Sequence, residues 1–220
     1  MLRVEFHCHT IYSKDSLTRP ETLIEICQSR GIDRVIVTDH NGIFGAQKAH
    51  QLDPDRVIIG EEIMTTKGEI LAAFVQEEIP EGLDPVEVIR MLRQQGAFIS
   101  VSHPFDILRK GHWESNHLLE IIPMVDAIET FNARCMRAQF NQEALDFAHL
   151  HNVAGTVGSD AHAAFELGQA TLFLSEFKNA NELRTVIRTG IPKVALSPPW
   201  VHLTSRYATW RKKLLSRPAP

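Results

Sequence analysis

The sequence contains little cysteine, no long apolar run and no excess of positive charge. Its three cysteines (Cys8, Cys27 and Cys135) are an odd number without CxxC spacing, which argues against a disulfide framework and favours a reducing cytoplasm. No apolar run reaches the roughly 18 residues of a membrane span, and the N-terminus leads into a predicted strand rather than a signal peptide. The formal net charge of −4 gives no overall attraction to nucleic acid or anionic membranes. We therefore expect a cytoplasmic protein that does not associate with membranes.

Histidine, in contrast, is abundant, with 11 residues in a chain of 220. His7 and His9 are one residue apart on a predicted strand, so their side chains should project to the same face and suit a shared metal ion. More candidate ligands follow at separate points in the chain: Asp15, Asp39-His40, Glu62 with His103, and Asp160-Ala161-His162. A ligand set made only of imidazole and carboxylate suits zinc, manganese or iron bound for catalysis.

Strand and helix patterns alternate along the chain. Short hydrophobic runs predict strands over residues 4–9, 34–38, 57–60, 69–76, 98–101, 127–131, 153–157 and 170–174. Helical spacing and capping signals predict helices over residues 20–30, 44–52, 84–95, 136–151 and 181–189. Most candidate ligands fall just after a predicted strand, and parallel strands joined by crossover helices would bring these positions to one rim. We therefore expect a barrel-like α/β domain over residues 1–196, followed by a basic and aromatic tail over residues 197–220.

The motifs also identify a resemblance to a known family. They are His7-Cys8-His9-Thr10-Ile11-Tyr12-Ser13-Lys14-Asp15-Ser16, Thr38-Asp39-His40-Asn41, Gly60-Glu61-Glu62, His103-Pro104 and Gly158-Ser159-Asp160-Ala161-His162. In this order they resemble the polymerase and histidinol phosphatase (PHP) family. The resemblance implies a single-domain α/β fold, a distorted TIM-like (β/α)7 barrel, with two or three divalent metal ions at its C-terminal rim. Small stand-alone members of the family are phosphoesterases.

The resemblance also implies how the ligands are shared. His7, His9 and Asp160 would hold one ion, with Glu62 as a bridge. Three further residues would surround neighbouring positions: Asp15, His40 and His162. His103 would serve a second or third ion. Glu69 and Asn132 stand where some family members have histidine, so the number of ions, two or three, stays open.

Ester hydrolysis is the chemistry that such a site favours, because paired divalent ions activate a water and neutralise phosphoryl oxygens. We expect Arg134, and less strongly Arg19, Arg109 and Lys110, to bind the substrate phosphate, since a guanidinium matches phosphate geometry. A surface role for Arg134 is an equal alternative. His103 or Asp39 would protonate the leaving group, although Asp39 could instead orient a ligand imidazole.

A cysteine nucleophile is the competing chemistry. Cys8 alternates away from the face that His7 and His9 share, so we expect it to pack in the core. We expect a structural role for Cys135 too.

The most favoured function is hydrolysis of a small-molecule phosphomonoester. A nuclease or phosphodiesterase that trims DNA or RNA ends is the second hypothesis, and a metal-binding module without catalysis is the third. The tail contains Trp210 and several basic residues, which fit either a solvated helix face or a nucleic-acid patch: Arg206, Arg211, Lys212, Lys213 and Arg217. The substrate, the metal and the oligomeric state are not determined by the sequence.

Overall fold

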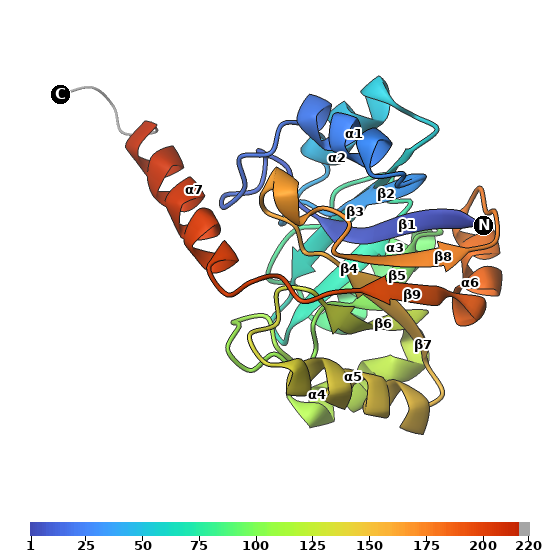
Figure 1. Cartoon of the computed structure of the whole chain (residues 1–220). Helices are drawn as coiled ribbons and strands as arrows, with labels where there is room; N and C mark the ends of the chain where they lie inside the picture. Colours follow the sequence, from blue (N-terminus) through green and yellow to red (C-terminus); the bar gives the residue numbers. More distant parts are fainter. Residues whose placement is uncertain (216–220) are drawn as a thin grey trace.

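A curved nine-stranded sheet forms the centre of the protein in a computed structural model that describes residues 1–215 (Figure 1). The strands follow the order β7-β6-β5-β4-β3-β2-β1-β8-β9 across the sheet. They are β1 (Leu2–Cys8), β2 (Arg34–Val37), β3 (Val57–Met64), β4 (Glu69–Ala73), β5 (Phe98–Val101), β6 (Ala127–Asn132), β7 (Ala154–Gly158), β8 (Ala170–Leu174) and β9 (Ile191–Val194). The helices are α1 (Pro20–Ser29), α2 (Phe44–Leu52), α3 (Pro85–Gln94), α4 (Ser115–Ile121), α5 (Ala138–Leu150), α6 (Ala180–Val186) and α7 (Val201–Leu215), with 3-10 turns at η1 (Ile122–Met124), η2 (Ala164–Glu166) and η3 (Ile187–Thr189).

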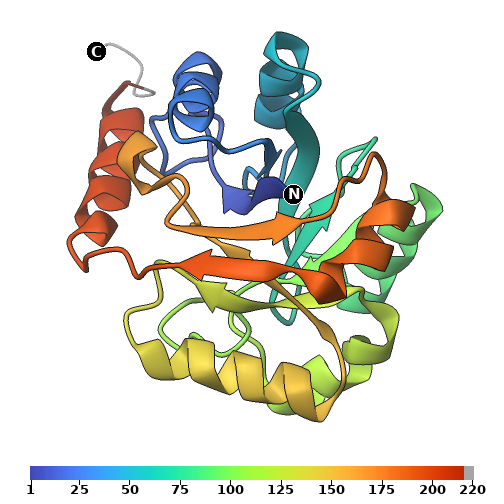
Figure 2. The same cartoon turned by 45° about the vertical axis from the view of Figure 1, so that its right-hand side comes forward.

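The sheet curves into a nearly closed barrel, which confirms the expected fold class. β7 approaches β1 without a continuous ladder, and the His9 N–H donates to the Ala161 carbonyl oxygen at 2.9 Å just beyond the two strands. Helices α1, α2, α3, α4 and α5 cover the outside of the sheet (Figures 1 and 2). The C-terminal ends of the parallel strands therefore meet around one mouth.

Two strands, β4 and β8, run against the expected parallel arrangement, and β8 pairs antiparallel with both β1 and β9. β4 pairs antiparallel with both β3 and β5. Only residues 65–68 separate β3 from β4, and a connection this short makes a hairpin, whereas a parallel crossover needs a dozen or more residues. Because of this reversal, β4 begins at the mouth where β3 ends, and Glu69 pairs with Met64 across the turn.

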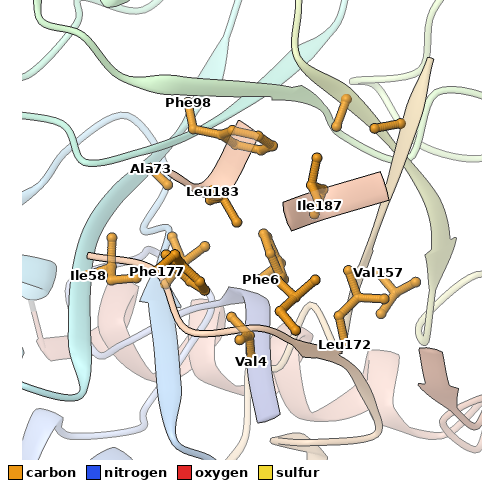
Figure 3. Close-up of a cluster of buried hydrophobic side chains, with 14 of the residues drawn as sticks. Val4, Phe6, Ile58, Ala73, Phe98, Val157, Leu172, Phe177, Leu183 and Ile187 are labelled. Atoms are coloured by element: carbon orange, nitrogen blue, oxygen red, sulfur yellow. The ribbon is translucent and has the colours of Figure 1, made fainter. Parts of the chain in front are cut away.

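The opposite end of the barrel is closed by a hydrophobic cluster. Phe6 and Phe98 point inward from the sheet, and Leu183 and Ile187 point toward them from α6 and η3 (Figure 3). Leu183 is fully buried. This apolar plug fixes the barrel below the mouth and leaves the polar residues of the strands at the other end.

Local sequence signals place most helices correctly. Asp84 caps α3 by accepting the Val86 N–H at 3.0 Å, and Pro85 occupies the first turn. Within the described residues, α4 and β9 are elements that the sequence reading did not predict. No helix over residues 1–215 is both long enough and apolar enough to cross a membrane.

The tail forms a helix that packs on the barrel. Arg134 Nη2 donates to the Val201 carbonyl oxygen (3.0 Å) and to the Ser205 hydroxyl (2.7 Å) at the start of α7. Near the other end of α7, the Lys212 ammonium donates to backbone carbonyl oxygens of the loop after β1. Arg217, the last basic residue of the proposed patch, lies outside the described residues. The boundary between residues 196 and 197 stays a prediction.

Candidate metal centre

Strand β1 carries the first two imidazoles into the mouth. His7 lies in β1 and His9 follows it, and their Nε2 atoms are 3.2 Å apart. Cys8, between them, points into the core, where its Sγ donates to the Ile36 carbonyl oxygen. Burial raises the pKa of the Cys8 thiol well above its ordinary value. Cys8 is thus the core residue that alternation predicts, and it stays a thiol rather than a nucleophilic thiolate.

Glu62 is the residue around which the cluster is arranged. It is buried within β3, and its carboxylate lies within 3.4 Å of four imidazoles. The nearest nitrogens belong to His7 (3.3 Å), His9 (3.4 Å), His40 (3.0 Å) and His103 (3.3 Å). The Ser102 hydroxyl donates to Glu62 Oε1 at 2.7 Å and so fixes the carboxylate. Residues from three separate segments of the chain therefore converge on one carboxylate.

Asp160 and Asp15 extend the cluster toward His162. Asp160 Oδ1 lies 3.2 Å from His9 Nε2 and 3.3 Å from His162 Nδ1. Asp15 lies 3.3 Å from His162 Nε2 and 3.5 Å from His40 Nε2. The side chains of Asp15 and His40 are 20% and 16% exposed, respectively, so the cluster opens to solvent on their side.

Glu69 joins the cluster because β4 is reversed. Its Oε2 lies 3.3 Å from His103 Nε2. Its oxygen also comes within 4.8 Å of ligand atoms on His40 and Glu62. Asn132 does not offer its oxygen: Oδ1 accepts the Arg134 N–H at 2.9 Å, and Nδ2 faces Asp160 at 3.3 Å.

The local backbone is adapted to these close approaches. Asp160 has φ of 52° and His103 has φ of 22°, values that are uncommon outside glycine and that occur at functional sites. A Cβ on Gly158 would collide with the Cβ of His7 and lie 2.5 Å from Glu129 Oε1. Only glycine therefore lets β7 approach β1 at this point.

Burial and charge shift the pKa values of these groups in opposite directions. Although burial acts to lower it, the pKa of His7 is raised well above its ordinary value by Glu62 and Asp160. Burial, with the neighbouring imidazoles of His162 and His40, lowers the pKa of His9 to about 3. The carboxylates thus draw positive charge into the site, while His9 remains a neutral ligand.

Unsatisfied polar atoms show that this donor set fits metal ions. Among the described residues, the buried atoms Glu62 Oε2, Asp160 Oδ1 and Asp15 Oδ1 have no hydrogen-bond partner. A buried carboxylate oxygen without a partner lowers the stability of the fold, so such an atom indicates that a ligand or ion binds there. Among the described residues there are three overlapping sets of three side chains, and within each set the ligand atoms lie within 4.8 Å of one another. The sets are His9, His40 and His162; His7, His9 and Glu62; and His40, Glu62 and Glu69. Divalent cations would satisfy these oxygens.

A surrounding layer orients the imidazoles. Asp39 accepts hydrogen bonds from the Thr10 N–H (2.7 Å) and the Ser13 hydroxyl (2.5 Å), and Ser13 Oγ lies 3.2 Å from His9 Nδ1. Asp39 therefore reaches His9 only through Ser13, which favours the orienting alternative over direct proton donation.

The sequence reading missed Glu129. Its Oε1 accepts from His7 Nδ1 at 3.0 Å, and its Oε2 accepts the His103 N–H (2.9 Å) and the Asn132 side-chain amide (3.0 Å). Glu129 is a lone acidic residue in the apolar run that predicts β6, and a buried carboxylate in such a strand is the signal that could have identified it.

The arginines occupy different positions. Arg109 Nη1 lies 2.6 Å from Asp160 Oδ2, at the cluster. Arg134 is buried, with Nε 3.2 Å from Glu166 Oε2, so its guanidinium already has a carboxylate partner. Arg19 is exposed at the N-terminus of α1 and lines a surface pocket with Tyr12. The phosphate-binding roles of Arg134 and Arg19 stay predictions.

Comparisons with known proteins agree with this geometry. The model of a family described as PHP-associated matches residues 138–191. The uncharacterized protein MJ0417 of Methanocaldococcus jannaschii is 36% identical over 178 residues, which are 80% of this chain and 71% of that protein. A second uncharacterized protein of the same organism, MJ1587, is 34% identical over 145 residues, which are 60% of this chain and 82% of that protein.

Solved structures share the fold at low sequence identity. A two-domain protein of Bacteroides vulgatus that contains a predicted PHP-like metal-dependent phosphoesterase has a TM-score of 0.70 at 18% identity, over 94% of this chain and 69% of that one. An amidohydrolase of Chromobacterium violaceum with bound sulfate and no metal has a TM-score of 0.61 at 12% identity, over 92% of this chain and 96% of that one. The lesion-specific endonuclease EndoQ of Pyrococcus furiosus has a TM-score of 0.57 at 15% identity, over 90% of this chain and 59% of that one.

Proposed function

This chain belongs to the polymerase and histidinol phosphatase (PHP) family, and on that premise we propose that it is a metal-dependent phosphoesterase that hydrolyses phosphomonoesters. The observation that carries the proposal is the buried Glu62 carboxylate, which lies within 3.4 Å of four imidazoles. Four imidazoles around one buried carboxylate, with Glu62 Oε2 left without a hydrogen-bond partner, suit a carboxylate that binds metal.

In this proposal the cluster holds two or three divalent ions such as zinc, manganese or iron. His7, His9 and Asp160 would hold one ion, and Glu62 would also supply its carboxylate to a neighbouring one. The neighbouring positions are held by Asp15, His40, His162, His103 and Glu69. When bound, the ions activate a water for attack on phosphorus and neutralise charge on the phosphoryl oxygens.

Protein groups supply the remaining steps. Arg109 pairs with Asp160 and Asp106, but it lies at the cluster and its side chain is 22% exposed, so it is the arginine we expect to meet a phosphoryl oxygen. Arg134 can take that role only by leaving Glu166. His103, whose Nε2 lies 3.3 Å from Glu62 and from Glu69, is the proposed donor of a proton to the leaving group only in an arrangement in which it does not bind an ion. Asp39 holds His9 in position through Ser13.

The experiment is removal and replacement of metal during hydrolysis of p-nitrophenyl phosphate. We expect chelation to abolish turnover and Mn²⁺, Zn²⁺ or Fe²⁺ to restore it. His7→Ala and His9→Ala should lose turnover at every metal concentration, while the control His149→Ala, on the exposed end of α5, should keep it. Full turnover in the two cluster variants would refute the proposal. Turnover by none of the proteins with any metal would favour a metal-binding module without catalysis.

A panel of substrates then separates the phosphoesterase classes. Sugar phosphates, nucleotides and histidinol phosphate report monoester hydrolysis, whereas oligonucleotides shortened from an end report the exonuclease alternative. Cleavage of oligonucleotides without release of phosphate from any monoester would replace the monoesterase proposal with the phosphodiesterase alternative.

A further inference from the structure

Helix α7 has one face on the barrel and the opposite face uncovered. Val201 and Ala208 are buried against the barrel, and Ser205 and Lys212 make their hydrogen bonds on the same side. The opposite stripe carries large apolar side chains at the helical spacing i, i+4, i+7 and i+11. They are Leu203 (62% exposed), Tyr207 (54%), Trp210 (57%) and Leu214 (44%). This stripe is therefore a surface rather than part of the core.

Exposed aromatic rings occur here in two pairs, which we call the aromatic platform: Phe165, Trp200, Tyr207 and Trp210. The ring centroids of Phe165 and Trp200 are 5.1 Å apart, and those of Tyr207 and Trp210 are 5.9 Å apart. Trp200 is 52% exposed and Phe165 is 40% exposed. Flat rings held open to solvent in this way can stack on planar groups of a ligand.

The charged side chains of α7 itself are all basic. All 27 acidic residues of the chain precede residue 201, whereas Arg206, Arg211, Lys212 and Lys213 all lie in α7. The rest of the protein is thus acidic, and this helix is a basic strip. A second copy of α7 would place like charges together, so a polyanion fits the strip better than another copy of the chain.

The platform begins beside the metal centre. Phe165 is three residues after His162, in η2. Glu166 of the same turn accepts the His162 N–H at 3.3 Å and pairs with Arg134, which anchors the start of α7. At the other end, Lys212 binds the loop that carries Asp15. Figure 1 shows α7 on the side of the barrel opposite α6, where the mouth lies.

We propose that α7 and the aromatic platform bind single-stranded nucleic acid and place its phosphorylated end at the metal centre. Bases stack on the paired rings, and the exposed Arg206 and Arg211 side chains contact the backbone phosphates. The binding part of this inference stands independently, whereas the substrate class that it names, a terminal phosphate on a single strand, rests on the proposed phosphoesterase function.

Binding is tested without catalysis, in chelator, with the full chain and a fluorescein-labelled 12-nucleotide single-stranded DNA of mixed sequence. Tyr207→Ala/Trp210→Ala should weaken the Kd measured by anisotropy at least tenfold, since stacking contributes about 1–3 kcal/mol per base. Arg206→Gln/Arg211→Gln should lower the slope of log K against log salt by about 1.4, because each phosphate contact on a single strand adds about 0.7.

The control removes two positively charged side chains outside α7. Arg90→Gln/Lys178→Gln, on exposed positions outside α7, should leave the Kd within twofold. An equal loss in the control and in the α7 variants would overturn the proposal. So would a wild-type chain that binds no strand but binds vesicles of phosphatidylcholine and phosphatidylserine, or one that dimerises through Tyr207 and Trp210 instead.

A catalytic assay with Mn²⁺ separates this inference from the proposed function. Tyr207→Ala/Trp210→Ala should raise the KM for a phosphorylated 12-nucleotide strand at least tenfold and leave hydrolysis of p-nitrophenyl phosphate unchanged. Hydrolysis of p-nitrophenyl phosphate by a wild-type chain that binds no DNA would overturn the platform and keep the phosphoesterase. DNA binding that depends on Tyr207 and Trp210, without hydrolysis of any phosphate ester, would keep the platform and remove the phosphoesterase.

Discussion

Glu129→Gln should weaken metal binding although Glu129 itself does not enter the ligand cluster. The Glu129 carboxylate accepts a hydrogen bond from His7 Nδ1 on one oxygen, and hydrogen bonds from the His103 N–H and the Asn132 amide on the other. This keeps the lone pair of His7 Nε2 directed at the cluster. A glutamine has one acceptor oxygen, and the two donors at Oε2 should retain it. Its NH2 group then faces His7 Nδ1 and favours the tautomer with the proton on Nε2.

The size of the effect follows from this change of tautomer. Loss of a group that orients a metal ligand typically costs 10- to 100-fold in metal affinity, which corresponds to about 1.4–2.7 kcal/mol. We expect the Kd for Mn²⁺ to rise by that factor in calorimetric titration of the metal-free protein. Turnover should recover at saturating Mn²⁺, because His7 is still present.

The matched control is Glu61→Gln. Glu61 is also fully buried, but its carboxylate accepts the Ile79 N–H at 3.1 Å, and no contact joins it to the imidazoles. This variant should keep the wild-type Kd. An unchanged Mn²⁺ affinity in Glu129→Gln, or an equal loss in Glu61→Gln, would show that the orientation of His7 does not control metal binding.

Three further predictions concern stability and substrate binding. Burial raises the pKa of Glu61 from 4.5 to about 8, so its stabilising neutral form is lost as the pH rises toward 8. The free energy of unfolding of Glu61→Gln, relative to that of the wild type, should therefore rise by up to about 5 kcal/mol from pH 4 to pH 9, at about 1.4 kcal/mol per pKa unit. Chemical unfolding of the metal-free proteins measures this difference, and a constant value across that range would contradict the assignment. Arg109→Gln should raise the KM for p-nitrophenyl phosphate about tenfold or more with a smaller effect on kcat, and an unchanged KM would remove Arg109 from substrate binding. Leu183→Ala should lower the free energy of unfolding by about 2–5 kcal/mol because it opens a cavity in the plug at the end of the barrel, while a loss under 1 kcal/mol would mean that α6 does not close the barrel.

Much of the fold could be predicted because it depends on local sequence. Helix α2 and strands β5 and β8 have the predicted bounds, since each is a short periodic run ended by clear signals. The reversal of β4 was not predicted because the sequence reading assumed crossovers throughout, although a four-residue connection between β3 and β4 permits only a hairpin. Residues 197–220 were predicted to be a tail, either a solvated helix face or a nucleic-acid patch. The helix α7 within them was not placed in the fold because its apolar stripe faces solvent rather than the core.

The candidate ligands were identified from motifs, but their roles relative to one another depend on long-range contacts. The spacing of His7 and His9 already indicates a shared face, whereas the contact of Glu69 with His103 depends on the antiparallel pairing of β4 with β5. Glu129 was missed since its partners are 122 residues away at His7 and 26 residues away at His103.

The sequence by itself indicated which residues are candidate metal ligands and that His7 and His9 share a face, because ligand chemistry and side-chain alternation are local properties. Only the tertiary structure decided which of these residues meet, which carboxylate orients His7, and that Arg109 rather than Arg134 lies beside Asp160. The physical reason is that pairing and closure of the sheet set distances between residues far apart in the chain, and no local pattern encodes those distances.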